Sequence, residues 1–414
     1  MHPRFQRLTI LLLAFVLLAG HVAPIRPAQA QSSTGNYVPG EVIVRLLPPL
    51  LGSVNTLLNS ITAQLGLQVL DQLGTLPVFR LKLLNNLLSV EQVINLLRVI
   101  PGVLYVEPNY IGQTPESVAR YSWFKGGEHG DYEGQWAADI MRLSEAHTVS
   151  RGAGVTVAVL DTGVDLDHPA LAGRLVPGFD FVDFDPIPAE EGIEGVDAAY
   201  GHGTHVAGLI ALAAPEAKIR PLRVLGPDGR GSSWLVAQTV RYAAGLPTLG
   251  LPLPTASADV ISISYSVPKR SLLLDDVLKL VGSLPGGPVV VAAAGNSGPS
   301  TAPEYPAAET LPSVLAVAAS TSSDTLATFS TRGNWVDVAA PGENILSSLP
   351  DDDYGTWSGT SMATPLAAGT AALVIAKYPN LTSSQVVSRI VSKSATIPGD
   401  VPRRIDAARA LDLP

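Results

Sequence analysis

Apolar positions in the first quarter of the chain follow two spacings, one typical of strands and one typical of helices. Alternating runs predict strands, and apolar residues three or four apart predict helices. Gly66 marks the end of one helix, and Ser89 with Gln92 forms a capping box at the start of another. The expected elements are a strand at 41–46, a helix at 54–65, strands at 67–70 and 76–83, a helix at 90–100 and a strand at 103–106. This β-α-β-β-α-β order predicts a small α+β domain.

Beyond residue 135 the apolar runs are continuous rather than alternating. Such runs are typical of strands that are buried on both faces of a parallel sheet. Helical spacing fills most of the segments between them. The runs lie at 155–160, 260–263, 289–294 and 314–319, and helices are expected at 202–213, 232–244, 272–281, 360–378 and 383–393. Residues 135–414 are therefore predicted to form an α/β domain with a mostly parallel central sheet and flanking helices.

Two further segments differ in composition from these domains. Residues 1–30 contain Arg4 and Arg7, then a short apolar run, and end in Ala28-Gln29-Ala30, which are the features of a secretory signal peptide. The apolar run is shorter than the about 20 residues that span a bilayer, so we expect cleavage and secretion. An uncleaved anchor is the alternative. Residues 113–134 are polar and glycine-rich, and we expect an exposed connector there.

Composition and charge narrow the possible chemistry. The 414 residues include no cysteine, which excludes disulfides, zinc–thiolate sites, iron–sulfur clusters and a cysteine nucleophile. The formal net charge of −9 argues against nucleic acid and anionic membrane surfaces as partners. The sequence thus predicts an exported protein that folds without disulfides.

Three residues with nucleophilic or acid–base side chains stand at the ends of the predicted elements. Asp161 ends the first buried strand, whereas His202 and Ser361 each open a helix. Open α/β sheets place their functional residues at these ends. A serine hydroxyl becomes a nucleophile when a histidine takes its proton, and a buried aspartate orients that histidine. Asn296 follows another buried strand, where its amide can donate to the oxyanion of a tetrahedral intermediate.

Each of these residues also has a purely structural interpretation. Taken singly, Asp161 and Asn296 are turn formers and Ser361 is a helix cap. His202 and His205 are three positions apart, but the sequence has no HExxH pattern and no thiolate partner, so no metal is expected there. The joint occurrence of aspartate, histidine and serine, each within a specific block, favours catalysis.

The blocks around these residues resemble those of the subtilisin-like serine proteases, the subtilases. They read VAVLDTGVDLDHPAL, GHGTHVAG, AAAGNSG and GTSMATP, and the resemblance extends from residue 135 to residue 414. It implies a subtilisin-like fold and a secreted serine endopeptidase that hydrolyses polypeptides through an acyl-enzyme. Asp161, His202 and Ser361 would then be the catalytic triad, with Asn296 in the oxyanion hole.

The N-terminal part of the chain resembles the inhibitory propeptide of the same family, which is also an intramolecular chaperone. The resemblance runs from VPGEVIVRL to VLYVEPNY. Residues 31–112 are thus expected to form a ferredoxin-like propeptide that inhibits its own enzyme. The connector 113–134 would hold the maturation site, and the chain would be a monomeric, self-processing zymogen.

The resemblance further implies where the substrate binds. Ser264, Tyr265 and Ser266 match the segment that pairs with the substrate main chain, and Gly295 lies beside Asn296. The family usually has glycine at the third of these positions, so Ser266 is expected to crowd the primary specificity pocket. The acidic stretch 180–197 has two interpretations, a solvated loop or a contact for basic substrate residues.

No cofactor is expected, because a calcium site that is common in the family lacks its ligands here. The block after the catalytic aspartate reads His168-Pro169-Ala170, where many relatives have a carboxylate at the third position. The calcium-binding loop after the catalytic histidine is also missing, since residues 209–214 lead directly to Pro215. Calcium prefers about six to eight oxygen ligands, which this stretch does not offer. A second calcium site, among Asp180, Asp183 and Asp185, is left open.

Three other functions fit parts of the sequence less well. Sedolisins share the GTS serine but replace the histidine with glutamate and the oxyanion asparagine with aspartate, so His202 and Asn296 argue against them. The α/β-hydrolases need a G-x-S-x-G block, which the sequence lacks. An inactive subtilase-like binding module would have a broken triad, whereas the triad here is complete.

Overall fold

The computed structural model describes residues 36–47, 53–85, 87–118, 123–248 and 250–414. The predicted signal peptide, residues 1–30, and the first residues of the predicted propeptide lie outside these ranges. Within them, no helix combines the length and the apolar character that a membrane crossing requires.

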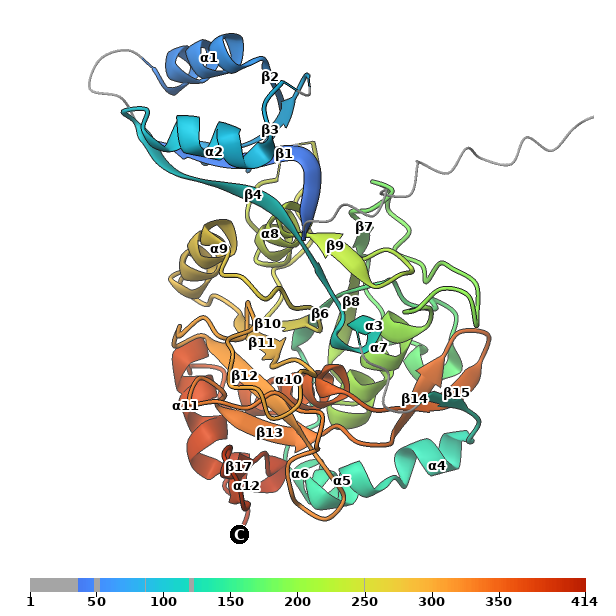
Figure 1. The fold of residues 1–414 in the computed structure, drawn as a ribbon. Helices are drawn as coiled ribbons and strands as arrows, with labels where there is room; N and C mark the ends of the chain where they lie inside the picture. The colour runs from blue at the N-terminus through green and yellow to red at the C-terminus, as the bar shows by residue number, and fades with distance from the viewer. Residues whose placement is uncertain (1–35, 48–52, 86, 119–122, 249) are drawn as a thin grey trace, which may run out of the picture. The chain divides into compact units, whose positions relative to one another are not determined.

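The N-terminal domain, residues 36–112, has the predicted β-α-β-β-α-β order (Figure 1). Its elements are β1 (Tyr37–Leu46), α1 (Val54–Leu65), β2 (Leu67–Gln72), β3 (Val78–Leu83), α2 (Val90–Arg98) and β4 (Val103–Gln113). The strands pair antiparallel in the order β2-β3-β1-β4. Gly66 ends α1 in the left-handed conformation, and both hydrogen bonds of the Ser89–Gln92 capping box are present. The predicted order of elements and both helix-end signals are confirmed.

The two faces of the N-terminal sheet are buried against different partners. Val42 and Val44 of β1 pack with residues of α1 and α2 in one cluster. Ile43, which points the other way, belongs to a cluster that contains Trp234 and Leu273 of the C-terminal domain. The N-terminal sheet therefore lies between its own helices and helices α8 (Ser233–Ala243) and α9 (Leu272–Gly282).

Two side chains of β4 satisfy the first amides of these helices. Glu107 accepts hydrogen bonds from the main-chain N–H groups of Leu272 and Leu273 at 2.8 and 3.0 Å. Asn109 Oδ1 accepts from Trp234 N at 3.1 Å. The first N–H groups of a helix lack partners within the helix, so β4 supplies caps from another domain.

The C-terminal domain is built on a nine-stranded sheet with the order β16-β17-β13-β12-β11-β10-β6-β8-β7. Its strands pair parallel except for β16 and β17. The sheet strands are β6 (Thr156–Asp161), β7 (Phe179–Asp180), β8 (Lys218–Arg223), β10 (Val260–Ile263), β11 (Val289–Ala293), β12 (Val314–Ser320), β13 (Val338–Pro341), β16 (Ala395–Thr396) and β17 (Arg403–Arg404). The mostly parallel α/β architecture predicted for this part is confirmed.

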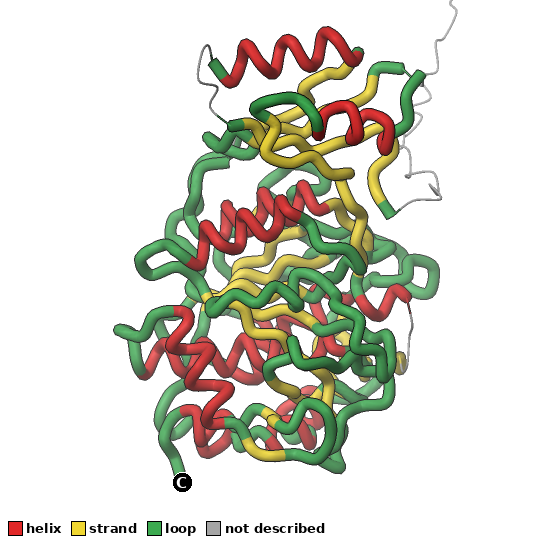
Figure 2. Tube along the Cα trace, turned by 60° about the vertical axis from the view of Figure 1, so that its left-hand side comes forward, coloured by secondary structure: helices red, strands yellow, loops and turns green. Residues whose placement is uncertain are grey.

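Helices cover both faces of this sheet (Figure 2). Val157 and Val159 of β6 belong to the cluster that contains α7 and α10, whereas Ala158 and Leu160 belong to the cluster of α8 and α9. The continuous apolar runs of the sequence follow from this burial on both sides. The remaining helices are α5 (Trp136–Ile140), α6 (Leu143–Ala146), η1 (Pro169–Leu171), α7 (His202–Ala213), α10 (Thr360–Lys377), α11 (Ser383–Lys393) and α12 (Ala407–Ala410).

The last strand of the N-terminal domain is longer than predicted. It was expected at 103–106, but β4 continues to Gln113 and pairs antiparallel with β9 (Arg230–Ser232). On its other side, Gln113 exchanges two main-chain hydrogen bonds with Ser266, with N···O distances of 3.1 and 3.0 Å. The end of β4 thus lies between strand β9 and the segment around Ser266 of the C-terminal domain.

The prediction of an exposed connector at 113–134 is wrong for several of its residues. Thr114, Glu116 and Tyr132 are buried. After α3 (Pro115–Val118), the segment adds β5 (Trp123–Lys125), which pairs with β15 (Asp353–Trp357) beside β14 (Ile345–Leu349), and α4 (His129–Glu133). The polar composition misled the prediction because the partners of these polar groups lie far away in the sequence.

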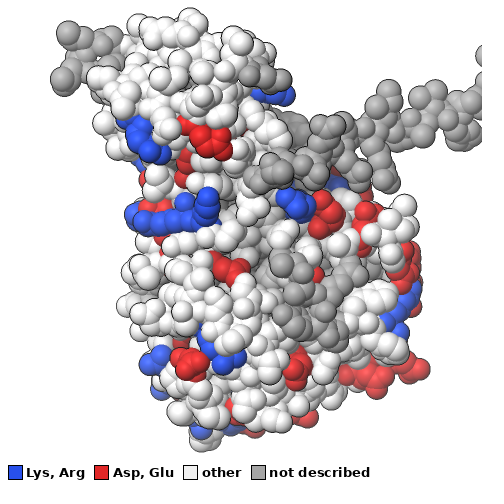
Figure 3. All heavy atoms as spheres, viewed as in Figure 1, with Lys and Arg blue, Asp and Glu red and all other residues white. Residues whose placement is uncertain are grey.

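Acidic and basic side chains are interspersed on the face of the described residues that Figure 3 shows. This part of the surface therefore carries no continuous field of one sign.

Candidate active site

Asp161 and His202 meet where a strand ends and a helix begins. Asp161 is the last residue of β6, and His202 is the first residue of α7, after Gly201 in the left-handed conformation (φ 87°). The His202 Nδ1 to Asp161 Oδ1 distance is 2.6 Å, and both side chains are buried. Asp161 Oδ1 also accepts from Thr162 N at 2.8 Å, which fixes the carboxylate.

Ser361 lies in the first turn of α10, where its main-chain N–H has no partner within the helix. Pro365, four residues later, has no N–H to donate to the Ser361 carbonyl. The hydroxyl of Ser264 donates to that carbonyl instead, at 3.3 Å. Ser264, predicted as a substrate-binding residue, thus holds the main chain of Ser361.

Asn296 follows β11 and is oriented by the start of the same helix. Its Oδ1 accepts from the main-chain N and the hydroxyl of Thr360 at 3.0 and 3.1 Å. The Thr360 hydroxyl in turn accepts from Gly295 N at 3.1 Å. With its oxygen held in this way, the Asn296 amide points its Nδ2 atom at a buried carboxylate, which also accepts a hydrogen bond from the Ser361 hydroxyl.

That carboxylate belongs to Glu116 of α3, a residue that the sequence did not single out. Glu116 Oε1 accepts from Asn296 Nδ2 at 3.0 Å and from Ser361 N at 3.4 Å. Glu116 Oε2 accepts from the Ser361 hydroxyl at 2.6 Å and lies 3.1 Å from His202 Nε2. One buried carboxylate therefore contacts the hydroxyl, the imidazole and two N–H donors at once.

Gly359 provides the space for Glu116. Its backbone is extended, so conformation does not require glycine there. A Cβ at this position, however, would lie 1.7 Å from Glu116 Oε1. Any larger residue would displace the carboxylate or the helix start.

Neighbouring carboxylates favour the charged form of His202, and His202 in turn favours the charged form of Glu116. Burial disfavours a charged His202, but the charge and hydrogen bond of Asp161, and then those of Glu116, raise its pKa to about 10. Burial also disfavours a charged Glu116, but His202, Ser361 and Asn296 lower its pKa below the ordinary value. In this arrangement the imidazole is protonated and donates from both ring nitrogens.

His205, the second histidine of the block, has a structural environment. Its Nε2 donates to the carbonyls of Ile345 and Gly355, both at 3.1 Å, and burial lowers its pKa to about 3. Trp357 lies against the rings of both His202 and His205, with centroid distances of 5.4 and 5.3 Å. Trp357 was not singled out from the sequence, although it lies four residues before Ser361.

The remaining predicted substrate-binding residues line the path of β4. Ser266 pairs with Gln113 through its main chain, and its side chain donates to Glu304 at 2.7 Å. The ring of buried Tyr265 lies beneath Gly112, where a Cβ would come within 2.3 Å of it. Gly295 lies against the carboxylate of Glu304, a second residue that the sequence did not single out.

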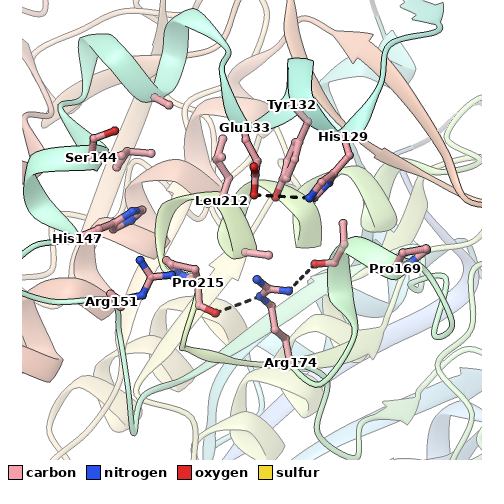
Figure 4. Close-up of a pocket in the computed structure, with 14 residues that line it drawn as sticks. His129, Tyr132, Glu133, Ser144, His147, Arg151, Pro169, Arg174, Leu212 and Pro215 are labelled. Carbon is pink, nitrogen blue, oxygen red and sulfur yellow. Dashed lines mark hydrogen bonds and ion pairs between the residues drawn. The ribbon is translucent and has the colours of Figure 1, made fainter.

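A guanidinium stands near Ala170, beside the block where no calcium site was expected from the sequence. Arg174 donates to the Ala170 carbonyl at 2.8 Å and to the Pro215 carbonyl at 3.1 Å (Figure 4). The two histidines and Arg151 that also line this pocket add further nitrogen donors rather than oxygen ligands. Two of the carbonyls in the pocket are thus already used by a cation.

The second expected calcium set is only partly assembled. Asp180 and Asp183 converge, but the third carboxylate is that of Glu191, whereas Asp185 accepts from the main-chain N of Ile187. Arg223 forms ion pairs with all three converging carboxylates. Among the described residues, the positive charge at this cluster of carboxylates comes from the Arg223 guanidinium, just as Arg174 supplies one near Ala170.

Comparison with protein families identifies both parts of the chain. Residues 152–407 match the model of the subtilase family, and residues 23–109 match the model of the fervidolysin N-terminal prodomain.

Individual relatives agree with these matches. The chain is 34% identical to the thermophilic serine proteinase of Bacillus sp. (strain AK1) over 365 residues, which are 84% of this chain and 80% of that protein. It is 39% identical to thermitase of Thermoactinomyces vulgaris over 250 residues, 58% of this chain and 81% of thermitase. The fold resembles the crystal structure of fervidolysin from Fervidobacterium pennivorans, with a TM-score of 0.72 and 24% identity over 93% of this chain and 62% of that one.

The environment of His202 predicts an unusual titration in the uncleaved chain. In a Ser361→Ala protein, His202 should stay protonated up to about pH 10, and Glu116→Gln should lower that pKa by removing one of the two carboxylates that raise it. The ion pair between His202 and Glu116 therefore exists at pH values above the pKa of Glu116, and it is lost as the pH rises through the pKa of His202. Titration of the imidazole nitrogens by NMR measures this. Glu133→Gln, at an exposed glutamate, is the control, and an unchanged His202 pKa in the Glu116 variant would contradict the coupling.

The Arg174 contacts predict stability without calcium at this position. In the Ser361→Ala background, EDTA should change the melting temperature by less than about 2 °C. Arg174→Ala should lower the free energy of unfolding by ~1–3 kcal/mol, because two partly buried carbonyls lose a charged donor. Arg151→Ala, which removes an exposed ion pair with Glu216, should cost at most ~1 kcal/mol. Thermal unfolding checks all three, and a large EDTA effect that calcium reverses would show the prediction to be wrong.

Proposed function

The chain belongs to the subtilase family of serine proteases and carries an N-terminal prodomain, and from this we propose that it is a secreted endopeptidase made as a self-processing zymogen. Asp161, His202 and Ser361 form its catalytic triad. The observation that carries this proposal is the position of Glu116, whose carboxylate contacts Ser361, His202 and Asn296 together.

In the proposed reaction, Ser361 Oγ attacks the carbonyl carbon of the scissile bond. His202 Nε2 takes the hydroxyl proton and later gives it to the leaving amine. Asp161, at 2.6 Å from Nδ1, keeps the ring in the orientation and tautomer that leave Nε2 free to accept. A water molecule then attacks the acyl carbon while His202 takes its proton. The acid product leaves, and His202 returns the proton to Ser361 Oγ.

The negative charge that develops on the carbonyl oxygen needs donors that are already in place. Asn296 Nδ2 and Ser361 N meet one oxygen of Glu116, and an oxyanion would occupy that point. The other oxygen of Glu116 lies between Ser361 and His202, where the second oxygen of a carboxylic acid product would lie. Glu116 therefore imitates a bound product.

The substrate main chain is proposed to follow β4. Between β9 on one side and Ser266 on the other, an extended peptide satisfies its backbone groups on both edges. This mode of binding recognises polypeptides irrespective of most side chains.

The same contacts support inhibition by the N-terminal domain. While Glu116 is in place, the oxyanion donors are occupied and His202 is protonated, so it cannot act as a base. The activated enzyme requires removal of this segment from the cleft. Secretion is inferred from residues 1–30, and we further propose a monomer that needs no cofactor and binds neither nucleic acid nor membranes after signal cleavage.

Loss of the nucleophile tests the proposed mechanism. Ser361→Ala should abolish peptide hydrolysis and leave the precursor uncleaved, because any residual rate would come from the oxyanion donors and binding alone. Ser322→Ala, at an exposed serine, should process and hydrolyse normally. Casein digestion measures hydrolysis, and mass spectrometry of the secreted protein measures precursor cleavage. A Ser361→Ala protein that still matures by itself would contradict the assignment of Ser361 as the nucleophile.

The helix caps supplied by β4 predict a chaperone effect. Parallel sheets fold slowly because their contacts are non-local. In the Ser361→Ala background, the full chain should refold faster than a chain that starts at Ile111, and Glu107→Ala with Asn109→Ala should give an intermediate rate. Stopped-flow tryptophan fluorescence follows refolding. Equal rates for the three proteins would exclude a chaperone role.

A further inference from the structure

Glu304 places a carboxylate beside two segments that flank the proposed substrate path, although the reaction described above does not use it. Tyr305, the next residue, exchanges two main-chain hydrogen bonds with Val267 at 2.8 and 2.9 Å. This pairing brings Glu304 next to Ser266, whose hydroxyl donates to Glu304 Oε2 at 2.7 Å.

Among the described residues, the groups that donate to the Glu304 carboxylate are all neutral. Besides Ser266, the hydroxyls of Ser297 and Thr331 donate to Oε1 at 2.6 and 3.3 Å. No lysine, arginine or histidine in the described ranges forms an ion pair with Glu304, which is partly exposed. The Glu304 carboxylate is therefore oriented by hydroxyls from three segments, and none of these hydroxyls carries a compensating positive charge.

This charge lies directly behind the oxyanion donors. A Cβ at Gly295, the residue before Asn296, would lie 2.3 Å from Glu304 Oε2 and 2.5 Å from Oε1. Gly295 therefore leaves the carboxylate in contact with the main chain at this point. The substrate residue whose carbonyl is attacked must pass between this main chain and the segment Ser264–Ser266, since Asn296 receives its oxygen and Gln113 marks its path.

Resting on the proposed function, we propose that Glu304 makes the enzyme selective for lysine or arginine immediately before the scissile bond. A basic side chain at that residue pairs with a carboxylate that is already oriented and unpaired, and arginine can bind it through two parallel hydrogen bonds. Ser266, expected from the sequence only to narrow the pocket, also positions this carboxylate.

The acidic stretch 180–197, the other source of negative charge considered for basic substrates, is less suitable. Asp180, Asp183 and Glu191 share Arg223 as a partner, and Glu194 pairs with Lys125. Its charges are largely engaged within the protein, whereas that of Glu304 is not.

Two peptides that differ only before the scissile bond, with arginine in one and citrulline in the other, test the proposal. Citrulline has the shape of arginine without its charge, so the ratio of the two kcat/KM values isolates the electrostatic selection. The mature enzyme should favour arginine by about tenfold or more, and Glu304→Gln should bring the ratio close to one. Glu304→Asp, which keeps the charge, should retain part of the preference, and Glu216→Gln at an exposed glutamate should leave it unchanged.

The outcomes separate this proposal from the proposed function. A ratio near one in the mature enzyme, or one that Glu304→Gln does not alter, overturns the role of Glu304 while leaving the protease assignment intact. If the mature enzyme digests casein but cleaves neither peptide, the role of Glu304 is likewise overturned, whereas digestion of neither casein nor the peptides counts against the protease assignment instead. Should Glu304→Gln fail to fold, the salt dependence of the ratio decides, because screening lowers it if the charge of Glu304 acts and leaves it constant if the charge does not.

Discussion

A buried positive charge between two buried carboxylates is the interaction on which the active centre depends. An isolated charge in the interior is strongly unfavourable, so His202 can be protonated there only because Asp161 and Glu116 both contact it. These three residues come from the end of β6, the start of α7 and the segment that follows β4, so their contacts bring these segments together. The N-terminal domain is thus coupled to the proposed catalytic groups by electrostatics as well as by the pairing of β4 with β9 and Ser266.

The sequence was sufficient to predict the elements whose signal is local. The strands of the central sheet are apolar throughout because both faces are buried, and α1 and α2 carry their own end signals in Gly66 and Ser89. The positions of Asp161, His202 and Ser361 followed from the rule that sites form at strand ends and helix starts. Glu116 and Glu304 could not be found in this way, since each is a polar residue in a polar segment and its contacts come from residues far away in the chain. The sequence could not predict the continuation of β4 to Gln113 for the same reason. The hydrogen bonds of this part of the strand are made to β9 and Ser266 rather than within its own domain.

Arginine supplies the positive charge at both places where the sequence raised calcium. Arg174 uses carbonyls beside Ala170, and Arg223 joins three carboxylates on the stretch that follows Asp180. A guanidinium carries only one charge, but its donors are fixed in a plane and it cannot be removed by dilution or by a chelator. It therefore ties two segments permanently where a bound ion would tie them only when the ion is present.

The two glutamates in the cleft differ in what balances them, and this difference bears on how the prodomain is released. The charge of Glu116 is matched by that of His202, which lies 3.1 Å away. Glu304 has no such partner in the part of the chain that the structure describes, and the segment that passes it offers Gln113, Thr114 and Pro115, none of which is basic. The prodomain accordingly holds the cleft through its main chain and Glu116 and leaves the charge of Glu304 unused. Under the proposed function and specificity, a substrate with a basic residue before the scissile bond gains an ion pair that the prodomain lacks, and it can therefore compete for β9 and Ser266 once the chain between the two domains has been cut.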